Sequence, residues 1–247
     1  MAREAPAFKR FFNALLDIVL PPTCHLCHSF IPDAGKLHIC PTCHDSLPLV
    51  SSPLCSICGI PFIGAGNDHR CGACLAHPPS FDIARAYFLY EGPIRDLIHS
   101  FKYNQRTHLR KPLALLTLEW LREYLSDQGP HLIVPVPLHR SRLRQRGFNQ
   151  AALLGRVLSR HLSLPILPDA LIRTRPTEPQ IKLSSTERRV NVKGAFNVKK
   201  PDRIAGKRIL LLDDVMTTGS TINECAGVLK KAGADRVIAA TIARTAR

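Results

Sequence analysis

Long apolar runs are missing from this 247-residue sequence. No segment approaches the ~18 consecutive apolar residues that a membrane-spanning helix needs. Near the N-terminus, Asn13 and Asp17 interrupt the apolar pattern and no small-x-small cleavage site follows, so a secretory signal is not predicted. Aromatic residues make up only 6% of the chain, which disfavours an extended platform for stacking nucleic-acid bases. Together these absences predict a soluble protein of the cytoplasm.

Acidic side chains are also scarce, with 19 against 34 basic ones and a formal net charge of +15. The imbalance is local, because residues 1–80 carry five side chains of each sign whereas residues 132–200 carry fourteen basic and three acidic ones. A cationic region of this kind suits pyrophosphate, nucleic acid or another anionic partner. The alternative is a set of solvated loops without any partner.

The strongest local pattern runs from Arg208 to Thr221. Residues 209–212 are all apolar, as in a strand that a parallel sheet buries on both faces. Helical spacing of apolar residues follows from Thr221 to Lys231. The residues in between therefore lie at the carboxyl end of a strand and the amino end of a helix. Ligands bind at such edges in open α/β sheets, and anions are attracted to helix N-termini.

Two groups of side chains occupy this edge. The first is an acidic pair, Asp213 and Asp214, whose carboxylates can accept hydrogen bonds from two sugar hydroxyls. The second is a turn of small polar residues whose hydroxyl and N–H groups can enclose a phosphate monoester: Thr217, Thr218, Gly219, Ser220 and Thr221. The lysine of a GxxxxGK[ST] loop is missing, so hydrolysis of nucleoside triphosphates is not predicted. A diol site beside a phosphate site predicts a ribose 5-phosphate.

This stretch resembles the signature with which type I phosphoribosyltransferases bind phosphoribosyl pyrophosphate (PRPP). The resemblance implies that Asp213 and Asp214 hold the ribose 2′- and 3′-hydroxyls and that residues 217–221 wrap the 5′-phosphate. It also implies that Mg²⁺ accompanies PRPP if the protein is active. Purine-salvage members usually place an acid where Thr217 stands, so purine salvage is disfavoured. No residue stands out as a general base, and the catalytic residues stay unassigned.

Eight of the nine cysteines form four Cys-x-x-Cys pairs. Without a secretory signal, such a number favours metal ligands over disulfides. Twelve residues separate the two pairs of each quartet, so the quartets form an internal repeat. Four thiolates make a closed tetrahedral zinc site that leaves no position for water. The predicted ligands of two structural zinc ions are Cys24, Cys27, Cys40, Cys43, Cys55, Cys58, Cys71 and Cys74.

Three alternatives to this metal assignment are open. An iron–sulfur cluster could take the place of zinc. The first and third pairs could share one ion across the repeat. Four histidines lie near enough in the sequence to replace a cysteine: His25, His28, His44 and His69. In every case these segments hold too little apolar material for a core of their own, so we expect them to fold only with metal.

The composition changes after Pro78 and Pro79, which places a domain boundary near residue 80. We predict an amphipathic helix over residues 1–22, a double zinc ribbon over 23–80 and an α/β domain over 81–247. Its strands are predicted over 84–90, 132–137, 209–212 and 236–243. Its helices are predicted over 92–103, 113–125, 147–161 and 221–231. Alternation of this kind predicts a parallel sheet with helices on both faces.

A second loop leaves the strand predicted over 132–137. By resemblance to the same superfamily, it would grip pyrophosphate with Pro137, Leu138, His139 and Arg140. The wording Val-Pro-Leu-His, followed by Arg-Gly-Phe-Asn-Gln, combines with the cysteine-rich N-terminus to resemble the ComF family, which includes the GntX-like proteins. The resemblance covers essentially the whole chain and implies zinc ribbons fused to a type I phosphoribosyltransferase fold. Some members serve natural transformation, working with a helicase-like partner as single-stranded DNA enters the cytoplasm.

Residues 171–198 are too polar and too broken by proline for a core. They predict a long excursion from the sheet, and long loops of compact domains are usually functional or disordered. In type I phosphoribosyltransferases such a loop closes over the substrate and excludes water. The candidate contacts of this lid and of the basic loop before it are Arg142, Arg146, Gln180, Arg188 and Asn191.

Three hypotheses follow from the sequence. The first is a ComF-like PRPP-binding protein that acts in DNA uptake or transfers a phosphoribosyl group to an unidentified acceptor. The second is a non-catalytic module with a vestigial PRPP site, in which the basic region 132–200 binds single-stranded DNA, Phe148 or Phe196 stacks a base, and a helicase-like protein docks. The third makes the zinc ribbons a protein-docking scaffold. Turnover, the acceptor and the oligomeric state are not determined at this level.

Overall fold

The computed structural model describes residues 21–32, 35–104, 106–176 and 185–246. The helix predicted over 1–22 falls almost entirely outside them, as does Gln180. The side chain of Arg188 is outside the description as well. Among the described residues, no helix combines the length and the apolar character needed to cross a membrane.

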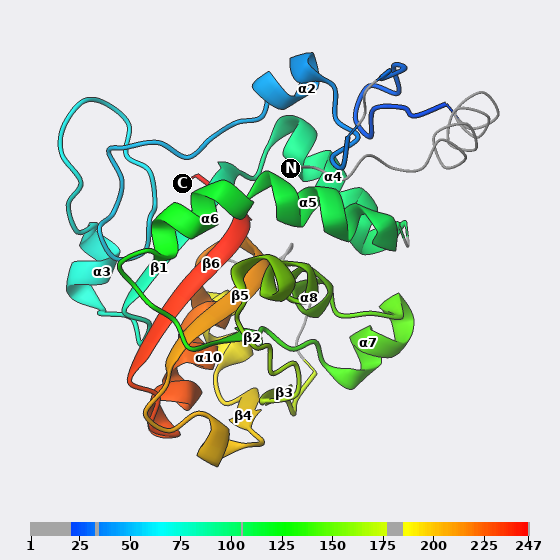
Figure 1. Ribbon diagram of the computed structural model, residues 1–247. Coiled ribbons are helices and arrows are strands. Elements are labelled where there is room, and N and C mark those ends of the chain that lie inside the picture. The colour runs from blue at the N-terminus through cyan, green and yellow to red at the C-terminus, as the bar shows by residue number, and fades with distance from the viewer. Residues whose placement is uncertain (1–20, 33–34, 105, 177–184, 247) are drawn as a thin grey trace.

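A four-stranded parallel sheet forms the centre of the molecule, with the strand order β1-β6-β5-β2 (Figure 1). Its strands are β1 (Ile83–Leu89), β2 (Leu132–Pro135), β5 (Arg208–Met216) and β6 (Arg236–Arg244). The predicted parallel sheet is therefore confirmed. The last strand lies between β1 and β5, so it is covered on both edges as well as on both faces.

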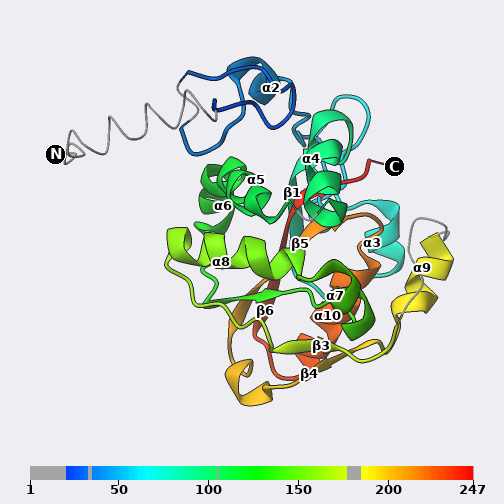
Figure 2. The ribbon, with the colours of Figure 1, turned by 90° about the vertical axis from the view of Figure 1, so that its right-hand side faces the viewer.

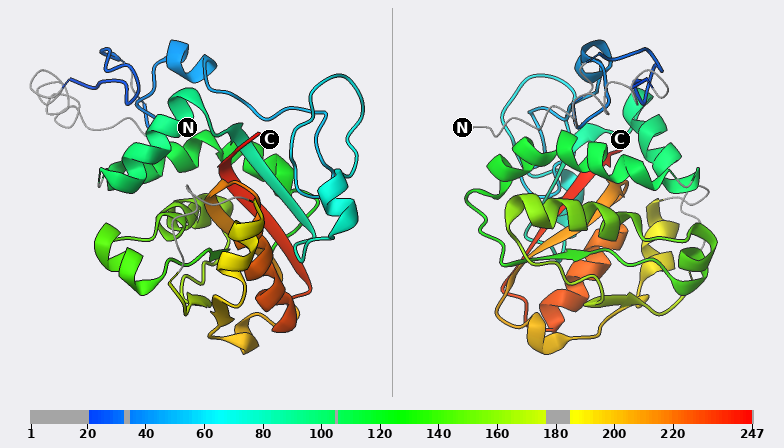
Figure 3. Two further views of the ribbon diagram at one scale, coloured as in Figure 1. Left: turned by 180° about the vertical axis from the view of Figure 1, so that it is seen from behind. Right: turned by 45° about the vertical axis from the view of Figure 1, so that its right-hand side comes forward.

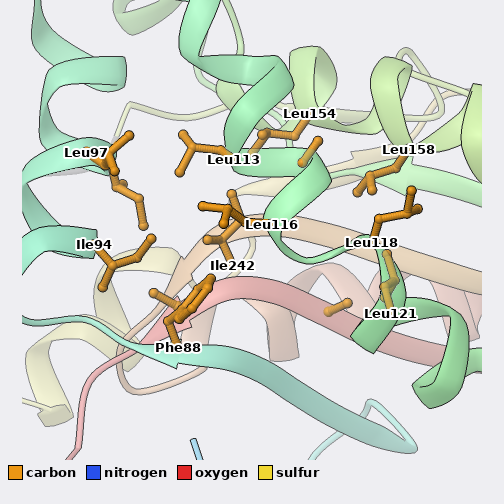
Figure 4. Close-up of a cluster of buried hydrophobic side chains, with 14 of the residues drawn as sticks. Phe88, Ile94, Leu97, Leu113, Leu116, Leu118, Leu121, Leu154, Leu158 and Ile242 are labelled. Atoms are coloured by element: carbon orange, nitrogen blue, oxygen red, sulfur yellow. The ribbon is translucent and has the colours of Figure 1, made fainter. Parts of the chain in front are cut away.

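Successive residues of the strands pack on opposite faces of the sheet. Leu210 and Leu212 join one apolar cluster, whereas Ile209 and Leu211 join the other. We call the face that carries Leu210 and Leu212 the first face. It is covered by the helices between β1 and β2 and by the second helix after β2 (Figures 1 and 2). They are α4 (Gly92–Tyr103), α5 (Arg110–Leu116), α6 (Leu118–Leu125) and α8 (Gln150–Leu162). Figure 4 shows their leucines converging on Phe88 of β1 and Ile242 of β6.

The opposite face is covered by α10 (Ser220–Lys231), so helices lie on both faces as predicted. Beside α10 lies a small antiparallel pair that the sequence did not indicate, β3 (Leu171–Arg173) and β4 (Phe196–Val198). A short helix, α9 (Ser185–Val192), precedes β4 and contacts α10. The predicted excursion therefore starts and ends in regular structure. Its central part, residues 177–184, lies outside the described residues.

Two other elements differ from the prediction. The helix predicted over 113–125 is divided into α5 and α6 at Thr117, whose buried hydroxyl donates to the Ala114 carbonyl at 3.0 Å. Such a side-chain bond competes with the helical backbone pattern. The helix predicted from residue 147 is preceded by α7 (Arg140–Arg146), which ends at Gly147 with φ +82°.

Both cysteine-rich segments pack on the sheet domain, but in different places (Figure 3). We call the segment from Cys24 to Cys43 the first ribbon and the segment from Cys55 to Cys74 the second ribbon. The first contains α2 (Pro41–Asp45) and lies near α4, whereas the second contains α3 (Gly72–Ala76) and lies beside β1. Between them, Leu49 pairs antiparallel with Phe88 and covers the free edge of β1.

Candidate functional site

The candidate site begins inside β5. The sequence predicted that Asp213 and Asp214 end this strand, but the strand extends to Met216, so both residues lie within it. Asp213 is paired in register with Thr241 of β6. The strand is longer than predicted because the neighbouring strand supplies backbone partners as far as Arg244. The acidic pair is consequently held by the sheet itself.

Residues 217–221, which we call the phosphate turn, follow β5 and run into the start of α10. Gly219 precedes the helix with φ +78°, a backbone conformation that L side chains rarely adopt, and a Cβ there would lie 2.7 Å from Cε of Met216. The hydroxyl oxygens of Thr218 and Ser220 are 2.8 Å apart. The N-cap residue Gly219 has no side chain, and the Thr218 hydroxyl accepts a long hydrogen bond of 3.4 Å from the Ser220 backbone N–H. A hydroxyl-lined turn at a helix N-terminus is suited to an anion.

The acidic pair is almost completely buried, with Asp213 8% and Asp214 3% exposed. Backbone N–H groups of Asp214 and Val215 donate to Oδ1 of Asp213 and of Asp214, each at 2.9 Å. The Nζ atom of Lys102 lies 2.7 Å from Oδ2 of Asp214. Lys102 ends α4 on the first face of the sheet, and its ammonium is the counter-ion of the pair.

The two carboxyls titrate differently because of these surroundings. Burial, reinforced by the charge of Asp214, raises the pKa of Asp213 well above its usual value. Burial alone would also raise the pKa of Asp214, but the ammonium of Lys102 outweighs it and holds that pKa below its usual value. Burial thus opposes the ionisation of Asp213, whereas Lys102 favours the ionised form of Asp214.

Lys102 is a functional candidate that sequence reasoning missed. A signal for it was present, because Lys102 stands four residues after the buried Ile98 and eight after the buried Ile94, on the apolar side of α4. Arg146 reaches the same neighbourhood from α7. Its guanidinium lies 5.2 Å from the Tyr103 ring centroid and donates to Oε1 of Gln150 at 2.8 Å.

The predicted pyrophosphate loop, residues 137–140, follows β2 and leads into α7. Nδ1 of His139 accepts a hydrogen bond from the Ser141 backbone N–H at 3.2 Å and caps this helix. The loop lines a cavity of about 920 Å³ together with α7, the start of α8 and β3. Neither Asp213 nor Asp214 is among the residues that line it. The loop and the acidic pair thus share an edge of the sheet without sharing this cavity.

The remaining candidate contacts are dispersed. Arg146 turns toward α4, and its charge helps to lower the pKa of Asp214. Arg142 lies on the other side, where its charge helps to lower the pKa of Arg173 in β3, although burial is the larger cause. Asn191 is half-buried in α9, and its backbone carbonyl accepts a hydrogen bond from Arg175 at 3.1 Å. Gln180 and the side chain of Arg188 lie outside the described residues.

The eight paired cysteines form two clusters, one in each ribbon. In each cluster the four Sγ atoms lie within 4.8 Å of one another, so each quartet closes on itself and the pairing across the repeat is not adopted. The Sγ atoms of Cys27 and Cys40 are 3.7 Å apart, and those of Cys58 and Cys71 are 3.8 Å apart. Four ligands at about 2.3 Å around a tetrahedral zinc ion would be about 3.8 Å apart. The clusters therefore fit zinc and leave no open position.

Backbone N–H groups turn toward the sulfur atoms of both clusters. Cys71 N and Cys58 N donate to Sγ of Cys55 at 3.3 and 3.4 Å, and Cys40 N donates to Sγ of Cys24 at 3.4 Å. Burial alone would raise the pKa of Cys55, but these bonds lower it to about 6. Each cluster thus contains one sulfur atom that accepts hydrogen bonds from backbone N–H groups, which favours its thiolate form.

Comparison with known proteins agrees with both parts of this description. Residues 15–75 match the model of the double zinc ribbon domain, and residues 149–247 match the model of the phosphoribosyl transferase domain. The fold and the cysteine clusters thus define a class of protein in which zinc ribbons precede a phosphoribosyltransferase domain.

Relatives specify the family. DNA utilization protein YhgH from Escherichia coli strain K12 is 37% identical over 233 residues, covering 92% of this chain and 99% of that protein. Competence protein F from Haemophilus influenzae is 34% identical over 213 residues, covering 80% and 93%. Competence protein ComFC from Bacillus subtilis strain 168 is 26% identical over 198 residues, covering 79% of each chain. The protein belongs to the ComF/GntX family, as its motifs predicted.

Proposed function

We propose that this protein binds PRPP, with Asp213 and Asp214 on the ribose diol and the phosphate turn around the 5′-phosphate. One observation carries the proposal. The acidic pair, the start of α10 and the hydroxyl-lined turn lie together at the carboxyl edge of a parallel sheet, inside the match to the phosphoribosyl transferase domain.

The charges of the site support a diol as the ligand of the acidic pair. Because Lys102 already balances Asp214, the pair does not present two free carboxylates to a cation. Hydroxyl donors fit it without disturbing that balance. When Mg²⁺ accompanies PRPP, it would neutralise the pyrophosphate, and Arg146 and residues 137–140 are the candidate protein contacts of that group.

If a phosphoribosyl group is transferred, the residues contribute mainly by position and charge. The diol and phosphate contacts would hold the ribose while an acceptor displaces pyrophosphate at C1. The side chains described above include no obvious base near Asp213, so the acceptor would bring its own nucleophile. We assign no catalytic residue.

The biological role that we propose is the use or uptake of DNA. It is supported by the names of the relatives, a DNA utilization protein and competence proteins. A cationic surface supports an anionic partner such as single-stranded DNA, because four of the seven residues of α7 are arginines. A helicase-like partner and a place in the cytoplasm belong to the same proposal.

Calorimetric titration with PRPP and MgCl₂ tests the ligand. The wild-type protein is expected to give saturable heat, and the double change Asp213→Asn with Asp214→Asn is expected to weaken binding about a hundredfold, because hydrogen bonds to charged groups contribute about 1.5–3 kcal/mol each. Asp127→Asn with Asp202→Asn is the matched control, since both residues are exposed and precede strands at the opposite edge of the sheet. Absence of heat in the wild type rejects PRPP as ligand, and equal binding by both double variants rejects the site.

A further inference from the structure

The second ribbon and the phosphate turn share a cavity. It measures about 170 Å³. One wall comes from the second ribbon and the residues just after it, including Cys58, Cys74 and His77. The other wall comes from the end of β5 and the start of α10, and its residues are Met216, Thr218, Gly219, Ser220 and Asn223. The predicted binding turn therefore faces a metal ribbon that lies more than 130 positions away in the sequence.

Several hydrogen bonds attach the second ribbon to β1 and β6, two strands of the sheet that holds the site. The backbone N–H of Ala84 donates to the Ile57 carbonyl at 2.8 Å, and the guanidinium of Arg85 donates to the Ser56 carbonyl at 3.1 Å. Arg244, buried at the end of β6, donates to the carbonyl of Cys58. Gly59 approaches so closely that a Cβ would lie 2.7 Å from the Ala84 carbonyl. The ribbon is held by backbone contacts and not only by apolar packing.

The segment that follows the second ribbon is attached to α10 itself. The backbone N–H of Ser80 donates to Oδ1 of Asn223 at 2.7 Å. Asn223 belongs to the first turn of α10, directly after the phosphate turn. His77, three residues before Ser80, is thus positioned between two anchors, the Cys74 metal ligand and the start of α10.

Without His77, the groups that line the cavity supply less positive charge than the negative charge of a phosphate monoester. A phosphate monoester carries about −1.5 to −2 at neutral pH, whereas a helix N-terminus supplies only about +0.5. Among the described residues that line the cavity, His77 is the only one whose side chain becomes cationic on protonation. The remaining polar lining consists of hydroxyl, amide and thiol groups. The volume is also adequate, because one water occupies roughly 30 Å³ of liquid and a phosphate group with a few waters fits in this space.

We propose that the second ribbon is part of the ligand site and that His77 binds the terminal phosphate of a phosphate monoester held in the phosphate turn. The inference rests on the proposed function and adds a residue and a wall to it. The metal of the second ribbon then has a role beyond stability, because it holds His77 in place. None of the described residues of the first ribbon lines this cavity, so the first ribbon is not expected to share the role.

Titration with ribose 5-phosphate tests the inference on the full chain. His77→Ala is expected to weaken binding about tenfold, the usual size of one lost charge-assisted hydrogen bond. His77→Lys, which places an ammonium group at the same wall, is expected to recover most of the loss. His44→Ala is the matched control, since His44 is an exposed histidine close behind the last cysteine of the first ribbon.

The outcomes separate this inference from the proposed function. Wild-type affinity in His77→Ala, an equal loss in His44→Ala, or failure of lysine to restore binding overturns the role of His77. If the change of both aspartates abolishes binding while His77→Ala does not, the ligand site stands and only the inference falls. If the wild type binds neither ribose 5-phosphate nor PRPP, both fall together.

Discussion

The two ribbons have the same spacing of cysteines but different surroundings. The first ribbon contributes Ile31 and Ile39 to the apolar cluster on the first face of the sheet. It is separated from α4 by a cavity of about 390 Å³ whose walls include His25, Asp96 and Ser100. The second ribbon instead contacts β1 and the end of β6 through hydrogen bonds and lies against the phosphate turn. Two ribbons with the same cysteine spacing therefore differ in the part of the sheet domain that they contact.

The ribbons also flank opposite ends of the candidate site. The first ribbon packs near α4, and α4 ends with the ammonium that neutralises Asp214. The second ribbon faces the turn predicted to hold the phosphate. In this arrangement the first ribbon affects the diol end only through α4, whereas the second contacts the phosphate end directly.

Removing one metal ligand from each ribbon is the strongest test of this comparison. Zinc binding contributes about 10–16 kcal/mol to the folding of small zinc-dependent units, so Cys74→Ser and Cys43→Ser are each expected to release about one of two zinc ions. Cys74→Ser should also weaken PRPP binding at least about tenfold, because it frees His77. Cys43→Ser should leave the affinity nearly unchanged. Metal analysis gives the zinc content, and calorimetry on the same samples gives the PRPP affinity. Equal losses of affinity in the two variants would contradict the proposed difference between the ribbons.

The next largest effect is expected at the diol end, in Lys102→Met. Loss of one partner of a buried ion pair costs about 3–5 kcal/mol of unfolding free energy, and the buried carboxyl of Asp214 would then take up a proton. PRPP binding should weaken as well, because a protonated Asp214 accepts hydrogen bonds less strongly than its carboxylate does. Lys111→Met in α5 is the control, since Lys111 is exposed. Chemical denaturation measures the stability of both variants.

The pKa shifts of Asp214 and Lys102 determine how the stability difference between wild type and Lys102→Met depends on pH. Asp214 has a folded-state pKa below its ordinary 3.8, so its contribution is present above pH 3.8 and is lost as the pH falls through the folded value. For Lys102, burial opposes the shift but Asp214 raises the pKa above its ordinary 10.5. Its contribution is present below pH 10.5 and is lost as the pH rises further. The stability gap between wild type and Lys102→Met should form a plateau between these limits, and a gap that grows above pH 10.5 would contradict the ion pair.

A smaller effect is expected where β6 holds the second ribbon. Arg244→Met removes a charged donor from the Cys58 carbonyl, and we expect a loss of about 1.5–3 kcal/mol in stability with weaker binding of ribose 5-phosphate. Arg95→Met is the control, because Arg95 is an exposed arginine on α4. Thermal unfolding and calorimetry are the measurements. Normal ligand affinity in a destabilised Arg244→Met would mean that the attachment of the ribbon does not influence the phosphate turn.

The smallest effect is expected at the linker. Asn223→Ala removes the acceptor for the Ser80 N–H, an ordinary hydrogen bond of about 0.5–1.5 kcal/mol, and should weaken ribose 5-phosphate binding by a factor of about two to three. Asp96→Asn, in the cavity beside the first ribbon, is expected to leave the affinity unchanged. Titrations at one temperature compare the two variants. A stronger effect of Asp96→Asn would reverse the assignment of the ribbons to the two ends.

Much of the fold could be predicted from local patterns. The helix predicted over 92–103 coincides with α4, because the positions of Ile94, Leu97 and Phe101 define one face. The failures also have local causes. The division at Thr117 depends on a side-chain hydrogen bond, and α7 lacked buried residues that would have produced a pattern. The pair β3–β4 joins residues whose contact depends on the path of the chain between them.

By itself the sequence determined the strand–turn–helix unit around the acidic pair and the two quartets of cysteines, since these features depend on spacings of a few residues. The tertiary structure alone decided that Lys102 meets Asp214, that the last strand inserts between β5 and β1, and that, of the described residues of the two ribbons, those of the second face the phosphate turn. Except for the pairing of the last strand with β5, these contacts join segments more than a hundred residues apart. Their selection depends on the burial of the whole domain, which no short pattern contains.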